Sequence, residues 1–140
     1  MLKKLPKTSH QLSVCEANFL RMKKILQNFS KNIYSFETIN PDSTSNMITF
    51  HVINRSKHTL IIEAKQNVDY GVFNSFIMRV QVCIDAKLAE VISYQGEKAI
   101  PYFMKISKSQ SRDEQLQQNR FLTEWLESIL MIGLNPNIKF

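Results

Sequence analysis

The chain has 140 residues, of which 44% are hydrophobic and 21% charged, as is typical of a globular protein. Its longest apolar runs fall short of the roughly 18 residues that span a bilayer, and its lysine-containing start has no apolar signal segment. We therefore expect a single domain over residues 1–140, located in the cytoplasm, with Cys15 and Cys83 reduced.

The net charge of +6 belongs entirely to the first 31 residues. They hold seven basic residues and one acidic residue, Glu16, and residues 1–7 form a basic N-terminal arm. Such an excess can attract nucleic acid or an acidic partner. We favour an ordinary solvated helix face, because no aromatic side chain is interleaved with these lysines to stack on a base. Nucleic acid stays a weakly supported alternative partner.

An amphipathic helix is predicted for residues 8–29, where apolar side chains recur at steps of three and four residues. Asn18 lies beside the apolar arc of this helix. The polar residues 30–46 follow, interrupted by Pro41, and they are predicted to form a connecting loop.

Alternation of apolar and polar residues predicts four strands, over residues 47–54, 58–66, 76–84 and 88–95. Matching the apolar sets of the first two strands pairs Val52 with Leu60 and Phe50 with Ile62. If Ala86 and Lys87 form the turn of the second hairpin, Val82 pairs with Val91 and Cys83 with Glu90. Residues 100–106 are an optional fifth strand, placed at an edge because Pro101 cannot donate a hydrogen bond.

The last predicted helix begins at Ser111 as N-cap, with Glu114 at capping-box spacing, and Gly133 is placed to end it. Its apolar side carries Asn119. The order of elements is αββββα, which predicts an α+β fold. In this fold the N-terminal and C-terminal helices pack on one face of an antiparallel meander of four to five strands.

Motifs of known chemistry are missing from the sequence. The three glycines, at positions 71, 96 and 133, are too far apart for a dinucleotide fingerprint or a phosphate-binding loop. A Rossmann-type dehydrogenase is therefore not supported. The three histidines show no metal-binding spacing, so we expect neither a metal nor a cofactor. Whether the protein is an enzyme stays undecided.

The polar face of the predicted sheet is the best candidate for a ligand site. It displays His51, Glu63, Arg79, Glu90 and Tyr94, which could converge into an anion-binding or acid–base pocket if the sheet curls. The simpler interpretation, which we favour, is the solvated outer face of an antiparallel sheet that is covered on one side.

Asn18 and Asn119 form a second candidate. Each lies near the apolar side of its helix, where an unpaired buried amide costs about 1–3 kcal/mol. We expect a polar contact that sets how the helices dock, with a ligand bound by both amides as the alternative.

Three segments, CEANFLRMKKIL, DAKLAEV and RDEQLQQNRFLTEWL, beginning at positions 15, 85 and 112, resemble the signature blocks of the YqiB-like family. The resemblance implies a bacterial cytoplasmic protein of unknown activity. It draws attention to the polar residues Glu16, Asn18, Asp85, Glu90, Asp113, Glu114, Gln117 and Asn119. The chain departs from the family pattern just before the last block and also within it. Within the block, Gln115 stands where similar proteins have a lysine.

From these observations we expect a non-catalytic binding or regulatory module. It would act on a protein or small-molecule partner, through the polar sheet face or the basic first helix. Two alternatives stay open. One is a small hydrolase or nucleotide-handling enzyme that uses Glu90, Asp113 or Glu114 in a shared cleft. The other is a weak nucleic-acid binder that uses residues 1–31.

Overall fold

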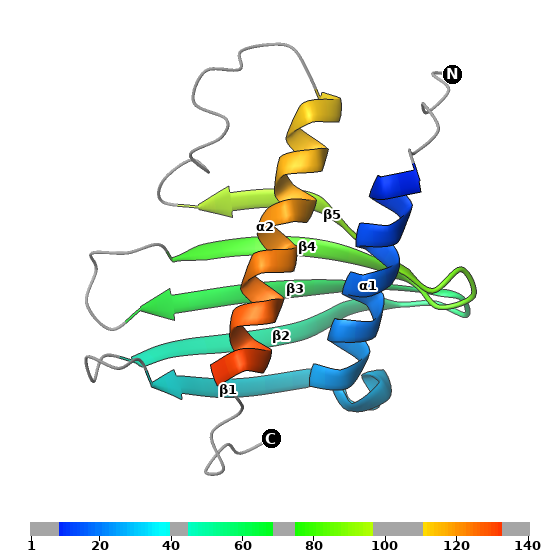
Figure 1. The fold of residues 1–140 in the computed structure, drawn as a ribbon. Coiled ribbons are helices and arrows are strands. Elements are labelled where there is room, and N and C mark those ends of the chain that lie inside the picture. Colours follow the sequence, from blue (N-terminus) through cyan, green and yellow to red (C-terminus); the bar gives the residue numbers. More distant parts are fainter. Residues whose placement is uncertain (1–8, 40–44, 69–74, 97–110, 133–140) are drawn as a thin grey trace.

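A computed structural model describes residues 9–39, 45–68, 75–96 and 111–132. In the described part of the chain, a long helix is followed by five strands and then by a second long helix (Figure 1). The elements are α1 (Ser9–Ile25), the 3-10 turn η1 (Gln27–Phe29), β1 (Ile33–Ile39), β2 (Ser45–Arg55), β3 (Thr59–Val68), β4 (Phe76–Cys83), β5 (Leu88–Gly96) and α2 (Ser111–Ile132).

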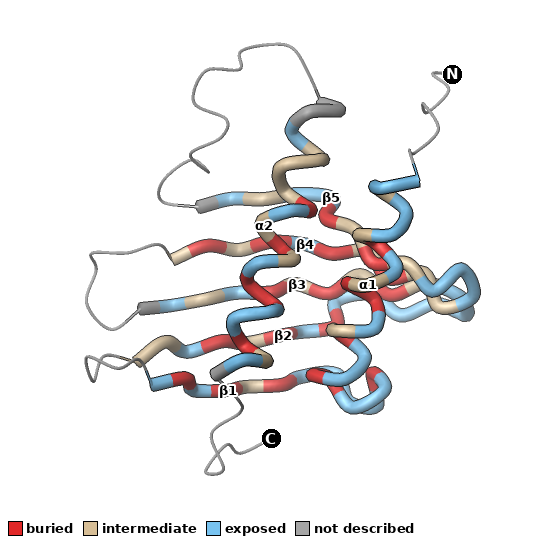
Figure 2. Tube along the Cα trace, in the orientation of Figure 1, coloured by how far each residue is buried: buried red, intermediate tan, exposed pale blue. Residues whose placement is uncertain are grey.

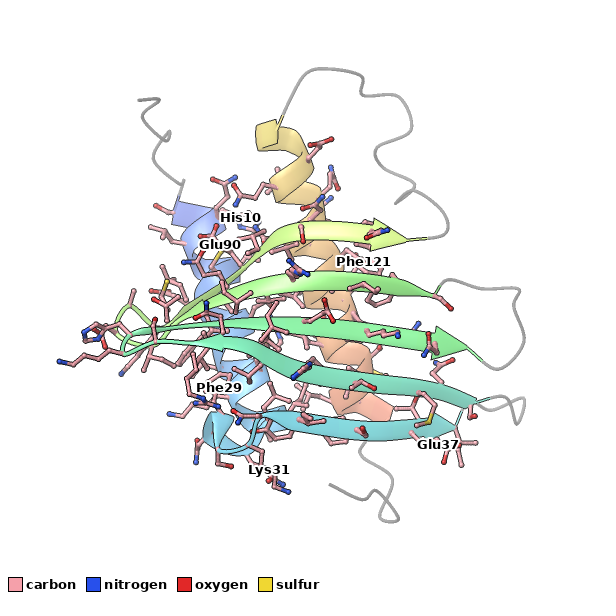
Figure 3. All side chains as sticks on the ribbon, turned by 180° about the vertical axis from the view of Figure 1, so that it is seen from behind. His10, Phe29, Lys31, Glu37, Glu90 and Phe121 are labelled. Atoms are coloured by element: carbon pink, nitrogen blue, oxygen red, sulfur yellow. The ribbon has the colours of Figure 1, made fainter. Side chains whose placement is uncertain are left out.

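The five strands form one antiparallel sheet in the order β1-β2-β3-β4-β5, so each strand pairs with its neighbour in sequence. Both helices lie across the same face of this sheet, and no helix or strand of the described residues covers the opposite face, which is called the open face below (Figures 1 and 3). The predicted α+β fold, with two helices on one side of a meander, is confirmed. Within the described residues, no helix combines the length and apolar character that crossing a membrane requires.

The core lies between the helices and the sheet. Buried and exposed residues alternate along β1, β2 and β4, because successive side chains of a strand point to opposite faces (Figure 2). The largest fully buried side chains are Tyr34, Phe36, Phe50, Met22, Ile25, Leu26, Ile48, Ile62, Met78, Leu122 and Leu126. They come from both helices and four of the strands.

The expectation that residues 30–46 form a loop is wrong. Residues 33–39 are the edge strand β1, whose buried residues Tyr34, Phe36 and Thr38 alternate with outward-facing ones. The turn-forming residues around Pro41 belong only to the connection between β1 and β2. The optional strand over residues 100–106 and the basic arm over residues 1–7 lie outside the described residues.

The expected registers of the two hairpins are also wrong. Val52 lies opposite Ile62, and Phe50 lies opposite Ala64, because Ile53 is an extra residue that forms a bulge in β2. In the second hairpin the turn takes the four residues 84–87, with Lys87 at a positive φ of 59°. The resulting pairs are Val82 with Ala89, Cys83 with Leu88, Gln81 with Glu90 and Val80 with Val91.

The connection between α1 and β1 has a fixed, unusual shape. Gln27, Asn28 and Phe29 have φ values of 52°, 61° and 59°, a region that is unfavourable for residues with a Cβ atom. The guanidinium of Arg55, at the end of β2, donates to the Phe29 carbonyl at 3.3 Å and to Asn32 Oδ1 at 2.9 Å. These bonds tie the approach to β1 to the neighbouring strand.

Candidate functional site

Three of the five predicted ligand-binding residues lie in one row across the open face. Glu63 on β3 is paired with His51 on β2 and with Arg79 on β4. Arg79 Nη2 is 3.4 Å from Glu63 Oε2, with 51% of the Arg79 side chain and 29% of the Glu63 side chain exposed. Because an exposed ion pair contributes at most about 1 kcal/mol to stability, this contact adds little to the stability of the sheet.

Large apolar side chains accompany this row on the open face. Met47 occupies an outward-facing position of β2 and is 41% exposed. Ile53 and Ile92 are the extra residues of the two bulges, and they follow Val52 and Val91, which face the helices. They are 39% and 46% exposed. The open face therefore combines an oppositely charged pair, Glu63 and Arg79, with exposed aliphatic groups.

Tyr94 lies on the opposite face from the one predicted. Its ring stacks on Phe76, with centroids 6.0 Å apart, and meets the edge of Phe121 on α2 at 5.7 Å. The bulge at Ile92 reverses the alternation of β5, which turns Tyr94 toward the helices. Burial there raises the pKa of the Tyr94 hydroxyl above its ordinary value.

Glu90 shares a row with Gln81, as an outward-facing residue of β5. Its Oε2 atom accepts a hydrogen bond of 2.9 Å from Gln115 Nε2 on α2. Gln115 is the residue that departs from the family pattern, and its amide still reaches the carboxylate. Glu90 is therefore held at the junction with the helix layer and does not extend the row of His51, Glu63 and Arg79.

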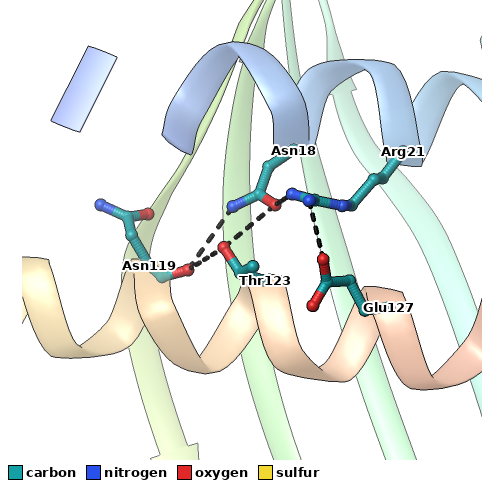
Figure 4. A network of polar contacts seen from close by, with 5 residues as sticks. All are labelled: Asn18, Arg21, Asn119, Thr123 and Glu127. Atoms are coloured by element: carbon teal, nitrogen blue, oxygen red, sulfur yellow. Dashed lines mark hydrogen bonds and ion pairs between the residues drawn. The ribbon is translucent and has the colours of Figure 1, made fainter. Parts of the chain in front are cut away.

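Asn18 and Asn119 are buried, as predicted, with 0% and 7% exposure. They belong to a polar junction, defined here as Asn18, Arg21, Asn119, Thr123 and Glu127 (Figure 4). Asn18 Nδ2 donates to the Asn119 carbonyl at 3.5 Å, and Arg21 donates to Asn18 Oδ1 at 2.8 Å and to Glu127 Oε2 at 2.9 Å. The Thr123 hydroxyl lies 3.0 Å from the Asn119 carbonyl and 3.2 Å from Asn18 Oδ1. The polar junction thus joins α1 to α2.

The Asn119 side chain extends the polar junction to the sheet. Its Oδ1 atom accepts the backbone N–H of Val91 at 2.8 Å. β5 is at the edge of the sheet, so this side chain takes the place that a neighbouring strand would have. The expected polar contact between the two helices is present, and that it sets how the helices dock stays a prediction. The partner of Asn119, a backbone amide 28 residues away, had no signal in the sequence.

The other polar residues of the family blocks are dispersed. Glu16 and Glu114 are exposed on the two helices, and the Asp113 side chain lies outside the described residues. The Asp85 carboxylate contacts His58 Nδ1, which links the turns of the two hairpins. Gln117 Oε1 is buried and has no hydrogen-bond partner among the described residues.

The two alternative functions gain little from this arrangement. Glu90 is bonded to Gln115 and Glu114 is exposed, so the shared cleft that the enzyme hypothesis requires stays a hypothesis. Among the described residues, no group of three or more His, Cys, Asp or Glu side chains is placed to hold a metal ion. On α1, Arg21 forms an ion pair with Glu127. Lys23 and Lys24 are exposed in the last turn of the helix.

The fold and the polar junction define a two-helix, five-strand α+β protein in which three distant sequence segments meet at the edge strand β5. A family model described as "Protein of unknown function (DUF1249)" matches residues 21–135, and the chain belongs to this family. The chain is 26% identical to "Uncharacterized protein YqiB" of Escherichia coli strain K12 over 133 residues, which are 91% of each chain. The YqiB proteins of Escherichia coli O6:H1 (strain CFT073) and O157:H7 match to the same extent. No solved structure gives a significant match. The resemblance to the YqiB-like family is confirmed.

Proposed function

We propose that this protein is a non-catalytic binding module that recognises a protein partner on the open face of its sheet. We also place it in the bacterial cytoplasm, in keeping with its bacterial relatives. The observation that carries the proposal is the composition of that face. Met47, Ile53 and Ile92 are exposed on the same face as the polar row of His51, Glu63 and Arg79.

The arrangement of layers supports this choice. Both helices cover one side of the sheet, so the other side of all five strands is accessible from outside (Figure 3). Small ligands are usually held in concave sites, whereas a broad sheet face presents many side chains to one large partner. Protein interfaces use apolar and charged groups together, and this face offers both kinds of group.

The charges on the face also favour a protein over nucleic acid. Arg79 and Glu63 lie within 3.4 Å of each other, and the acidic member of the row lies between His51 and Arg79. A phosphate backbone requires an unbalanced positive surface. The Glu63–Arg79 pair instead presents both signs side by side, which fits a partner that carries charges of both signs.

The proposal is tested by site-specific photocrosslinking in bacterial cells. A photoreactive residue replaces Met47 on the open face or, as the matched control, Leu20, which is 62% exposed on α1. We expect one defined adduct from position 47 and none from position 20. The partner is then purified, and we expect Ile53→Asp to weaken its binding at least tenfold, whereas Leu20→Asp leaves binding unchanged. Equal binding of both variants, or adducts from position 20 alone, would contradict the proposal.

A further inference from the structure

The two edges of the sheet differ. At the β5 edge, the bulge at Ile92 interrupts the ladder, and Asn119 accepts the N–H of Val91. Both features hinder the addition of another strand. At the other edge, β1 is regular over Ile33–Ile39, with no register shift against β2 and with neither lysine nor proline. Within the described residues β1 ends the sheet.

The outward side of β1 presents a regular row of backbone groups. Val52 N donates to Asn32 O at 2.8 Å, which marks a hydrogen-bonded pair of the β1–β2 ladder. Bonded pairs alternate with non-bonded pairs in an antiparallel ladder. The even-numbered residues of β1 therefore direct their N–H and C=O groups toward β2. The groups directed away from the sheet belong to Ile33, Ser35, Glu37 and Ile39.

The same four residues point their side chains to the open face, and the first and last are isoleucines. Ile33 is 56% exposed and Ile39 is 54% exposed. Exposed aliphatic residues at both ends do not protect an edge strand against pairing, whereas charged residues or proline would. Their positions are symmetric about Phe36, so the strand matches an antiparallel copy of itself.

We propose that β1 pairs with β1 of a second copy of this chain, in antiparallel orientation about a twofold axis at Phe36. The two sheets then join into one. Ile33 of each copy lies opposite Ile39 of the other, and Ser35 lies opposite Glu37. All four pairs join residues whose backbone groups face outward, so every outward N–H of β1 meets a carbonyl of the other copy. The proposal rests on the sheet edge, and it stands independently of a partner on the open face.

Side chains select this register over its neighbours. A shift by one residue would place outward-facing backbone groups opposite inward-facing ones, which breaks the ladder. A shift by two residues in one direction places the two Glu37 carboxylates directly opposite each other, and like charges at such positions are unfavourable. In the other direction Ile33 lies opposite Glu37, and Ile39 loses its apolar partner.

The seam is short, because seven residues at about 3.3 Å each span only about 23 Å. A contact along one strand pair of this length buries less area than the standard protein–protein interface, which buries about 1,600 Å² in total. We therefore expect a weak dimer that dissociates on dilution, with a dissociation constant in the micromolar range or above.

Sedimentation of the full chain over a wide concentration range tests the proposal. The wild type should show a rise in mass toward twice that of the monomer. Ser35→Pro removes one outward N–H without breaking a bond to β2, so it should abolish dimerisation while circular dichroism shows an unchanged fold. The control variant Leu20→Glu changes an apolar residue of α1 that is 62% exposed, and it should dimerise as the wild type does.

A charge pair tests the register. Ile33→Glu alone and Ile39→Lys alone should each weaken the dimer at least tenfold. Both changes in one chain should restore it at low salt, because the two introduced charges meet only across the antiparallel seam. Within one strand these positions are about 20 Å apart. A wild type that stays monomeric at its highest soluble concentration overturns the proposal. So does a dimer that Ser35→Pro leaves intact, or a double variant without rescue.

Discussion

Replacing Asn119 tests whether the polar junction anchors β5 to the helix layer. Asn119→Ala removes the acceptor of the Val91 N–H, a bond of 2.8 Å at a residue that is 7% exposed. A buried donor left without a partner costs about 1–3 kcal/mol. Alanine is a better helix former than asparagine, which returns about 0.5 kcal/mol. We therefore expect the free energy of unfolding to fall by about 0.5–2.5 kcal/mol.

Urea unfolding measures this loss, and amide hydrogen exchange localises it. In the wild type, the Val91 amide should exchange slowly although it lies on an edge strand, because Asn119 holds it. In Asn119→Ala its exchange should accelerate by about tenfold or more, since 1.4 kcal/mol corresponds to a factor of ten. Amides in the middle of the sheet, such as that of Ile62, should change only by the global loss of stability.

Two further variants separate the hydrogen bond from its surroundings. Asn119→Leu keeps a side chain of similar size but has no acceptor, so it should expose the Val91 amide as the alanine variant does. Arg120→Ala changes the neighbouring exposed residue and should alter stability by less than about 0.5 kcal/mol. If Val91 stays protected in both Asn119 variants, the argument that this side chain replaces a neighbouring strand is wrong.

Other contacts give three further predictions. Trp125→Phe keeps an aromatic ring but loses the 2.8 Å bond from Nε1 to Gln66 Oε1, so urea unfolding should show a loss of about 1 kcal/mol. Gln115→Lys turns the contact with Glu90 into an ion pair, and it should raise the free energy of unfolding by at most about 1 kcal/mol, an increase that salt removes. Because burial raises the pKa of Tyr94, its contribution to stability is complete below about pH 10 and declines as the pH rises further, since the unfolded chain loses that proton first. Tyr94→Phe should reduce this alkaline loss in urea unfolding measured between about pH 9 and 11, and an unchanged pH profile would contradict the reasoning.

The candidate site was only partly predictable. The sequence placed His51, Glu63 and Arg79 on one face, because their strands alternate regularly up to that point. It missed the orientation of Tyr94, because one extra residue, Ile92, reverses every side chain that follows it in β5. A bulge depends on the pairing with β4, and the residues of β5 alone carry no sign of it.

β1 shows a similar limit at the level of a whole element. Tyr34, Phe36 and Thr38 alternate with Ser35 and with outward-facing neighbours, which is a usable strand signal. The polar residues around Pro41 obscure this strand signal, because they follow it directly and extend the predicted loop over both segments. The strand also gains most of its stability from pairing with β2, a contact that its own seven residues do not reveal.

By itself, the sequence determined both long helices, four of the strands and the burial of Asn18 and Asn119. These features follow from the spacing of apolar residues, which repeats every 3.6 residues in a helix and every 2 in a strand and can be recognised within a short segment. Tertiary structure alone decided the bulges at Ile53 and Ile92, and it also decided that Asn119 binds the Val91 amide. A hydrogen bond between residues far apart in the chain forms only when packing brings donor and acceptor together, and packing is a property of the whole fold.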